Sequence, residues 1–348
     1  MMIKRNGILA ALVTLLTLAL PLRAWKVVPL VSYSTSSGVL LGGVVNHNMM
    51  PPFSPYAFGT MAYVYTDGSV HAEPQLLVPS GNGLFRFRVN YSARRENRFF
   101  GWGNGGSGDV YGEYAAEVLE GAGSYSFSPF VGFLLTAGIM GRHSVVYDRS
   151  GDPLWEQSPS QEYGSLWTAG PFLEGRWLFP SLIDGYLTGN IDLQEGGEAG
   201  YSRWEASAAA FAPLGGSTLT GLRLRLGRHT DTASTPFSFI PSLGGSSGLR
   251  GYADGRFAGD WTLLANLELR QKVFSLAVDE QNRFDVSLVL FGDAGQVADH
   301  LEGLGWERFH FDGGLGARLS LPGGGALRAD FALSPEGLGI QMGLGELF

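Results

Sequence analysis

Hydrophobic and polar residues alternate with a period of two along most of this chain. Residues 84–93 read LFRFRVNYSA, with apolar side chains at one set of alternate positions and arginine, asparagine or serine at the other. Residues 222–228 and 327–333 repeat the pattern, and residues 263–272 follow it except at Leu264. Side chains of a β-strand point alternately to opposite faces. The pattern therefore predicts strands with one apolar and one polar face.

A soluble β-sandwich also alternates in this way, with its apolar face turned inward. Three observations favour a membrane barrel instead. The polar faces carry glycines and clustered charges, the apolar stripes run for about ten residues, as a tilted transmembrane strand requires, and the connections differ in length in a regular way. We therefore predict an all-β fold, a closed transmembrane antiparallel β-barrel of about 16 strands.

The expected strands can be placed along the chain by this alternation. They cover residues 26–34, 38–48, 56–66, 69–79, 83–96, 110–121, 128–147, 163–178, 182–192, 201–212, 216–228, 258–274, 283–297, 306–320, 325–334 and 337–348. An even number of strands returns the C-terminus to the periplasm. Proline cannot donate to a strand ladder, so Pro74 and Pro171 argue against the two strands that contain them.

The connections between these strands alternate between short and long. The short ones are Pro51–Pro55, Ser80–Asn82, Phe179–Ser181, Pro213–Gly215 and Pro322–Gly324, and the long ones are Asn97–Asp109, Asp148–Glu162, Gln194–Gly200, His229–Phe257 and Ala298–Gly305. All the long connections then fall on one side of the membrane. Outer-membrane barrels have this asymmetry, with short periplasmic turns and long external loops.

The N-terminus has the layout of a secretory signal peptide. Lys4 and Arg5 precede an apolar run, Gly7–Leu20, and cleavage is expected after Ala24. The alternative is an anchoring helix, but a run of this length makes only about 21 Å of helix against a hydrocarbon core of roughly 30 Å. We therefore expect residues 1–24 to be a signal peptide and residues 25–348 to form the barrel.

The composition narrows the classes of function. Charged residues make up only 16% of the chain, against about 25% in soluble domains. The formal net charge of -8 disfavours a nucleic-acid partner. The absence of cysteine excludes disulfides, thiolate metal sites and a cysteine nucleophile. Outer-membrane lipids are the expected surroundings.

The last predicted strand ends on an aromatic residue. Met342, Leu344 and Phe348 share its apolar face, and glycines with Gln341 lie on the other. We interpret Met342, Leu344 and Phe348 as a C-terminal assembly signal, through which a barrel-assembly machinery inserts this chain.

Four segments in the C-terminal third carry a resemblance to a known family. They are Leu249-Arg250-Gly251-Tyr252, followed by Asp254-Gly255-Arg256-Phe257; Asn266-Leu267-Glu268-Leu269-Arg270; Phe291-Gly292-Asp293-Ala294-Gly295; and the run from Arg328 to Phe348. Phe100-Gly101-Trp102-Gly103-Asn104 gives weaker support. In their order and spacing these segments resemble the BamA/TamA family of outer-membrane assembly factors, the bacterial surface antigen domain.

The resemblance implies a sixteen-stranded barrel whose sixth external loop folds back into the lumen. In such barrels the loop arginine pairs with acidic residues of the wall, which here are Glu268 and Asp293. Asp293 shares its lumen-facing side with Phe291. Gly251 is expected to allow a tight turn and Tyr252 to pack beside it. Without the resemblance, a solvent-exposed loop arginine is the simpler interpretation.

Family members also carry periplasmic repeat domains that capture client proteins. Here strand-like sequence begins within a few residues of the predicted signal peptide, so we expect a short member without such repeats. Capture of clients then depends on a separate periplasmic partner.

Other motifs point to no catalytic site, metal or cofactor. Gly101, Gly103 and Gly106 match a dinucleotide fingerprint, but the helix that such a motif requires does not follow, so we interpret the segment as an external loop. The histidines are scattered, and His229 and His300, each near an aspartate, are interpreted as surface residues. We expect no enzyme.

Two functions of different classes remain open. The first is insertion or translocation of outer-membrane proteins through a lateral opening between the first and last strands. The second is a plugged structural or surface barrel that anchors a partner. A passive channel is disfavoured if the loop of Arg250 fills the lumen, and a lipid-modifying enzyme ranks last.

Overall fold

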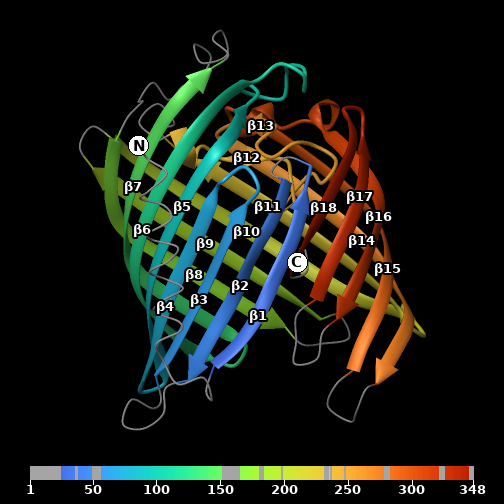
Figure 1. The fold of residues 1–348 in the computed structure, drawn as a ribbon, viewed down its shortest axis with the longest axis horizontal. Coiled ribbons are helices and arrows are strands. Elements are labelled where there is room, and N and C mark those ends of the chain that lie inside the picture. The colour runs from blue at the N-terminus through green and yellow to red at the C-terminus, as the bar shows by residue number, and fades with distance from the viewer. Residues whose placement is uncertain are drawn as a thin grey trace.

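The computed structural model describes residues 25–35, 38–48, 56–150, 165–179, 184–196, 199–230, 235, 237–246, 248–277, 283–320 and 326–344. Its strands form a closed antiparallel barrel (Figure 1). The sixteen barrel strands are β1 Trp25–Ser34, β2 Gly38–Asn48, β3 Ala57–Tyr65, β4 Val70–Ser80, β5 Gly83–Phe99, β6 Gly112–Phe130, β7 Phe133–Ser150, β8 Ser165–Phe179, β9 Asp184–Gly196, β10 Ala199–Gly215, β11 Thr218–His229, β14 Trp261–Ala277, β15 Arg283–Ala298, β16 His310–Ser320, β17 Ala326–Ser334 and β18 Gly337–Leu344. The predicted fold class is confirmed.

The two faces of each strand differ in polarity as the alternation predicts. On β14, Leu267 points away from the barrel and is 54% exposed, whereas its neighbours Asn266 and Glu268 point into the lumen and are fully buried. An outward apolar belt suits a lipid environment. Closure of the barrel gives each strand a neighbour on both sides. No helix in the part of the chain that the structure describes is long and apolar enough to span a bilayer.

Several predicted boundaries are wrong. The connection expected after residue 121 belongs to β6, which runs on to Phe130 and turns at residues 131–132. Gly121 and Gly123 lie within this strand, and the ring of Phe87 on β5 lies 3.7 Å from where a Cβ of Gly123 would stand. The aromatic ring therefore covers the glycine-rich stretch that, in the sequence, has the composition of a turn.

Two predicted connections are also misplaced. Most of the long loop expected at Gln194–Gly200 is strand, since β9 extends to Gly196 and β10 begins at Ala199. The turn expected at Pro213–Gly215 lies at residues 216–217, and a register shift between Pro213 and Gly215 accommodates the proline in β10.

The two prolines that argued against their strands, Pro74 and Pro171, lie at gaps in a ladder. Pro74 of β4 pairs with Thr60 of β3, but the ladder to β5 skips Glu73 and Pro74. Pro171 of β8 pairs with Ile139 of β7, and the ladder to β9 skips Gly170 and Pro171. At each proline, the ladder to one neighbouring strand has no pair, so the missing N–H costs that ladder no hydrogen bond. The prolines are therefore compatible with β4 and β8.

The longest described loop, between β11 and β14, folds into the external half of the lumen. We call its described residues 235, 237–246 and 248–260 the plug. They contain the 3-10 helix η4 Phe237–Phe239 and a two-stranded sheet of β12 Ser242–Leu243 and β13 Phe257–Ala258 (Figure 1). Leu243, Leu249, Tyr252 and Phe257 of the plug pack with Val297 of β15 and with Leu264, the apolar exception on the lumen face of β14.

Candidate functional site in the lumen

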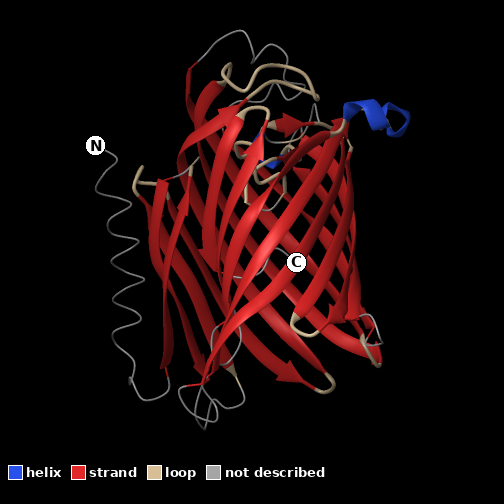
Figure 2. Ribbon diagram, turned by 90° about the vertical axis from the view of Figure 1, so that its right-hand side faces the viewer, coloured by secondary structure: helices blue, strands red, loops and turns tan. Residues whose placement is uncertain are grey.

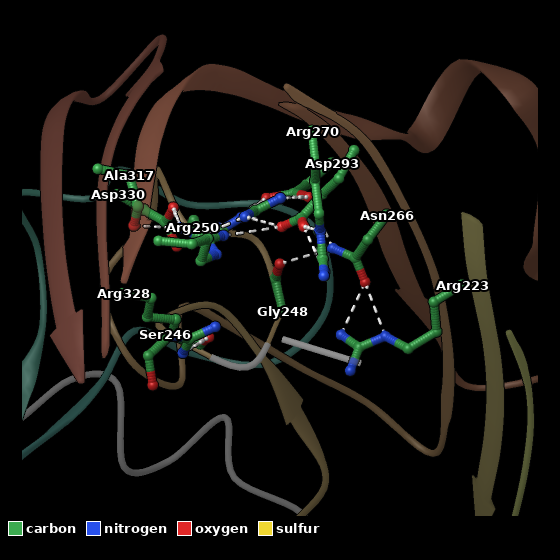
Figure 3. A network of polar contacts seen from close by, with 12 residues as sticks. Arg223, Ser246, Gly248, Arg250, Asn266, Arg270, Asp293, Ala317, Arg328 and Asp330 are labelled. Atoms are coloured by element: carbon green, nitrogen blue, oxygen red, sulfur yellow. Dashed lines mark hydrogen bonds and ion pairs between the residues drawn. The ribbon is translucent and has the colours of Figure 1, made fainter. Parts of the chain in front are cut away.

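Arg250 of the plug lies at the centre of a buried ion-pair network (Figure 3). Its Nε donates to Oδ2 of Asp293 and its Nη2 to Oδ1 of the same carboxylate, both at 2.8 Å. Its Nη1 donates to Oε1 of Glu268 at 2.6 Å and reaches Oδ2 of Asp330 at 3.5 Å. A loop arginine is thereby joined to three wall strands, β14, β15 and β17, through a planar two-pronged contact that lysine cannot form.

The wall carboxylates are themselves shared with further arginines. Arg318 of β16 donates to Oδ1 of Asp330 at 2.7 Å and to Oε1 of Glu268 at 3.1 Å. Arg270 of β14 donates to the other oxygen of Glu268 at 2.8 Å. Because both Glu268 oxygens are engaged, its burial is compensated by hydrogen bonds on each side.

An amide links the network to the neighbouring strand and to the plug backbone. Asn266 of β14 donates to Oδ1 of Asp293 at 2.7 Å and to the carbonyl of Gly248 at 3.1 Å. Its own oxygen accepts two hydrogen bonds from Arg223 of β11, at 3.0 and 2.7 Å. The wall therefore contacts both the side chain of Arg250 and the backbone that leads to it.

The surroundings of Arg250 keep it charged. Its guanidinium carbon lies 3.5 Å from the ring centroid of Phe291, which adds a cation–π contact. Burial alone lowers the pKa of Arg250, but the hydrogen bonds and charge of Asp293, with the charges of Glu268 and Asp330, raise it overall. Phe291, Glu268 and Asp293 are thus brought together around Arg250.

Gly251 lies in a tight turn, as expected, since the amide of Tyr252 donates to the carbonyl of Leu249 at 3.2 Å, but the turn is not what requires a glycine. Its φ is not positive, so no left-handed turn requires a glycine there. A Cβ at this position would lie 2.8 Å from Cβ of Asp312 and 3.0 Å from Cβ of Ser334. The glycine allows the plug backbone to approach the wall, where the Gly251 carbonyl accepts a hydrogen bond from Oγ of Ser334 at 2.8 Å.

Tyr252 packs in the apolar cluster of the plug and contacts the wall through its phenol. Its hydroxyl donates to the carbonyl of Phe311 at 3.2 Å, and its ring meets that of Phe257 edge to face. Burial, with the charges of Asp312 and Glu336, raises the pKa of Tyr252 to about 12. The hydroxyl therefore remains protonated and able to donate at physiological pH.

A second arginine cluster, which the sequence did not reveal, lies on the opposite wall. Arg142 of β7 donates from Nε to Glu120 of β6 at 2.8 Å, and from Nη1 to Asp192 of β9 at 2.6 Å and to the hydroxyl of Tyr201 of β10 at 2.8 Å. The plug touches it through the ring of Phe239, whose centroid lies 5.1 Å from the Arg142 guanidinium carbon. Alternation places each of these residues in the lumen, but no sequence signal pairs them.

A third arginine joins the plug to two other external loops. Nε of Arg256 donates to both carboxylate oxygens of Glu336, at 2.7 and 3.0 Å, and its Nη2 donates to the carbonyl of Gly106 at 2.7 Å. Glu336 lies in the turn between β17 and β18, and Gly106 lies in the loop between β5 and β6. Arg256 lies in the segment Asp254-Gly255-Arg256-Phe257, which carries part of the family resemblance. Membership of this segment was the sequence signal that could have marked Arg256 as a contact residue.

The remaining predicted residues lie elsewhere or outside the description. Met342 points outward on β18 and pairs with Tyr33 of β1. Leu344 ends β18 opposite Leu327, whereas its side chain, Phe348 and Ala24 lie outside the described residues. The interpretation of His229 as a surface residue is wrong: it is buried, stacks on Tyr201 and hydrogen-bonds to Oγ1 of Thr235 at 2.8 Å.

The site is built from charges that neutralise each other. Within the described ranges, no group of three or more histidine, aspartate or glutamate side chains has the arrangement of a metal site. The carboxylates around Arg250 are instead occupied by guanidinium groups. The geometry is suited to holding a loop against a wall.

Together, the closed barrel and the lumen plug define an outer-membrane β-barrel whose sixth external loop folds into the lumen. Residues 185–348 match the family model described as the Omp85 superfamily domain. Comparison with curated protein sequences gives no match.

Solved structures with a similar fold include BamA and CdiB. BamA from Haemophilus ducreyi lacking POTRA domains 1-3 aligns at 15% identity over 92% of this chain and 69% of that chain, with a TM-score of 0.63. CdiB from Escherichia coli aligns at 15% identity over 93% and 63%, with a TM-score of 0.65. CdiB from Acinetobacter baumannii aligns at 14% identity over 93% and 60%, with a TM-score of 0.59. The chain thus spans less than two thirds of the CdiB chains, and these similarities concern the fold.

Proposed function

We propose that this outer-membrane barrel aids the insertion or translocation of other outer-membrane proteins through a lateral opening between β1 and β18. The observation that carries the proposal is that the described ladder between β1 and β18 stops at Met342, although β18 continues to Leu344. Among the described residues, β1 pairs with β18 only at Tyr33–Met342 and Ser34–Gln341. Within the described residues, Gly343 and Leu344 pair with Arg328 and Leu327 of β17 but have no ladder partner on β1.

Two contacts outside the ladder also cross the seam in the part of the chain that the structure describes. The amide of Thr35 donates to the carbonyl of Ile340 at 3.1 Å, and the hydroxyl of Ser32 contacts the carbonyl of Met342. On the other side of β18, β17 pairs continuously from Leu327–Leu344 to Ser334–Gly337. At Gly343 and Leu344 the edge of β18 therefore offers backbone donors and acceptors that an incoming strand can satisfy by β-augmentation.

A disulfide across the seam tests this proposal, since the chain has no cysteine of its own. Tyr33→Cys with Met342→Cys places two thiols at directly paired positions, where Cα separations of about 4.5–5.5 Å suit a disulfide. We expect the oxidised double variant to fail to complement a deletion strain, which loses other outer-membrane barrels as measured by quantitative proteomics.

The matched control joins two strands that already pair fully. Val31→Cys with Leu41→Cys lies on the same outward face of β1 and β2 and should complement whether oxidised or reduced. Full complementation by the oxidised seam variant, or unchanged barrels in the deletion strain, contradicts lateral gating.

The second candidate function is a plugged barrel that anchors a partner without insertase activity. The contacts of the plug with both walls favour it, because Oγ of Ser238 hydrogen-bonds to Oγ of Ser144 at 2.5 Å while Arg250 is joined to the opposite wall. Full complementation by the locked seam would select this function.

The partners follow from the proposed function. Client outer-membrane proteins and a periplasmic partner belong to the insertase hypothesis. Removal of residues 1–24 as a signal peptide, and insertion by a barrel-assembly machinery that recognises Met342, Leu344 and Phe348, belong to both hypotheses.

A further inference from the structure

The loop between β15 and β16 leans away from the barrel. Its 3-10 helices, η5 Leu301–Gly303 and η6 Trp306–Arg308, stand clear of the wall at the external rim (Figure 2). Trp306 is 88% exposed and Leu301 50% exposed. Trp306 is the most exposed tryptophan or phenylalanine in the described part of the chain. We call residues 301–309 the rim loop.

Hydrogen bonds hold the rim loop in this position. Within it, the amides of Gly303, Leu304 and Arg308 donate to backbone carbonyls three residues earlier, at 2.9, 3.1 and 3.1 Å. The side chain of Gln296 accepts from the amide of Gly305 at 3.0 Å. Trp306 is therefore exposed on a loop whose backbone is held by hydrogen bonds.

Contacts on both sides of the rim loop fix its ends. Before it, Asp299 accepts a hydrogen bond from the indole nitrogen of Trp102 at 2.5 Å. After it, His310 stacks on Phe257 of the plug, with ring centroids 3.8 Å apart. The residues on either side of the rim loop thus contact the loop between β5 and β6 and the plug.

The aromatic side chains of the rim loop continue the lipid-facing belt. Trp306 lies 5.7 Å from Phe309, and Phe309 lies 5.9 Å from Phe311, measured between ring centroids. Phe311 is 59% exposed on the outward face of β16, with Leu315 further along the same face. An unbroken aromatic series therefore leads from the belt to the tip of the rim loop.

We propose that the rim loop is a membrane-surface anchor, with Trp306 and Leu301 inserted at the boundary between headgroups and acyl chains of the outer leaflet. Tryptophan prefers this boundary because its ring is apolar and its N–H polar. The exposed charged residues of the loop, Glu302, Glu307 and Arg308, can remain in the hydrated headgroup layer. The partner is a lipid surface, and its source is the leaflet that already surrounds Phe311.

Spin labels at single cysteines test this assignment in proteoliposomes containing only the purified full chain and lipid. We compare Trp306→Cys with two references: Phe311→Cys on the lipid face and Asp109→Cys, which is exposed on the loop between β5 and β6. The expected result is that the label at 306, like that at 311, collides more with oxygen than with a water-soluble nickel complex. Accessibility equal to that at 109 overturns the proposal.

A second pair of variants tests whether Trp306 itself holds the loop at the membrane. With the label at Leu301→Cys, Trp306→Ala should raise nickel accessibility several-fold, whereas Trp306→Phe should leave it close to the parent value. No change with either variant contradicts anchoring by Trp306. Shielding of position 306 in whole cells but not in proteoliposomes overturns the lipid assignment in favour of a protein partner.

Discussion

The two arginine clusters of the lumen are built from the same chemistry but connect different parts of the molecule. At Arg250 the guanidinium comes from the plug and the carboxylates come from the wall strands β14, β15 and β17. At Arg142 the guanidinium, both carboxylates and the tyrosine all come from barrel strands. The first cluster therefore fixes a loop, and the second joins strands to each other.

This difference indicates which side of the barrel holds the plug. On the β14–β17 side, Arg250, the carbonyls of Gly248 and Gly251 and the hydroxyl of Tyr252 all contact the wall. On the other side, the plug places a ring over Arg142, shares a hydroxyl pair with Ser144 and packs Ala258 against Phe99 of β5. Its ion pair on that side, Asp254 with Arg94 of β5 at 3.3 Å, is half exposed and therefore weaker than the buried pairs of Arg250. The plug should therefore remain with the β14–β17 wall if the seam beside β18 opens.

The largest effect is expected for Arg250→Ala. It leaves Asp293 without a guanidinium partner and Glu268 and Asp330 with fewer, all fully or nearly fully buried. Removing one partner of a buried ion pair costs about 3–5 kcal/mol. Urea unfolding in detergent micelles should show a loss of this size, together with a lower temperature for heat-modified migration in gels.

Arg250→Lys serves as the matched variant, because it keeps the charge but not the two-pronged contact with Asp293. We expect an intermediate loss of stability. An unfolding free energy unchanged in Arg250→Ala would mean that the plug is held by its apolar contacts alone.

Arg142→Ala should have a smaller effect. Glu120 keeps Arg88 at 2.8 Å and Asp192 keeps the side chain of Gln194 at 2.6 Å, so the cost is nearer about 2–3 kcal/mol, as for lost hydrogen bonds to charged groups. The same urea titration measures it. A loss equal to or larger than that of Arg250→Ala would remove the distinction between the two clusters.

The smallest effect is expected for Gly251→Ala, at about 1–2 kcal/mol, because the added methyl group must displace Asp312 and Ser334. Gly105→Ala is the control, since a Cβ there meets nothing within 4 Å. Equal stability of the two variants in thermal melts would show that the plug backbone can move away from the wall at no cost.

The barrel could be predicted from the sequence because alternation reports which face of a strand meets lipid. Leu264 illustrates the limit of that pattern: as an apolar residue on the lumen face it broke the alternation, and the structure places it against Leu249 and Phe257 of the plug. The strand ends of β6 and β9 were missed because glycines and polar residues occur both in turns and in strands covered by aromatic rings.

The two arginine clusters also differ in how far the sequence predicts them. The residues around Arg250 were found through the order of short motifs. Nothing comparable points to Arg142, Asp192 and Tyr201, since alternation turns a side chain inward without specifying which inward side chains meet across several strands. The role of Gly251 was missed because close approach to Asp312 and Ser334 depends on the position of the plug.

The most direct test of the account is hydrogen–deuterium exchange of the plug amides 248–252 in the wild-type chain, Arg250→Ala and Arg142→Ala. The account predicts strong protection in the wild type, rapid exchange in Arg250→Ala, and protection close to wild type in Arg142→Ala. Equal deprotection in both variants, or protection retained in Arg250→Ala, would contradict the claim that Arg250 holds the plug to the β14–β17 wall.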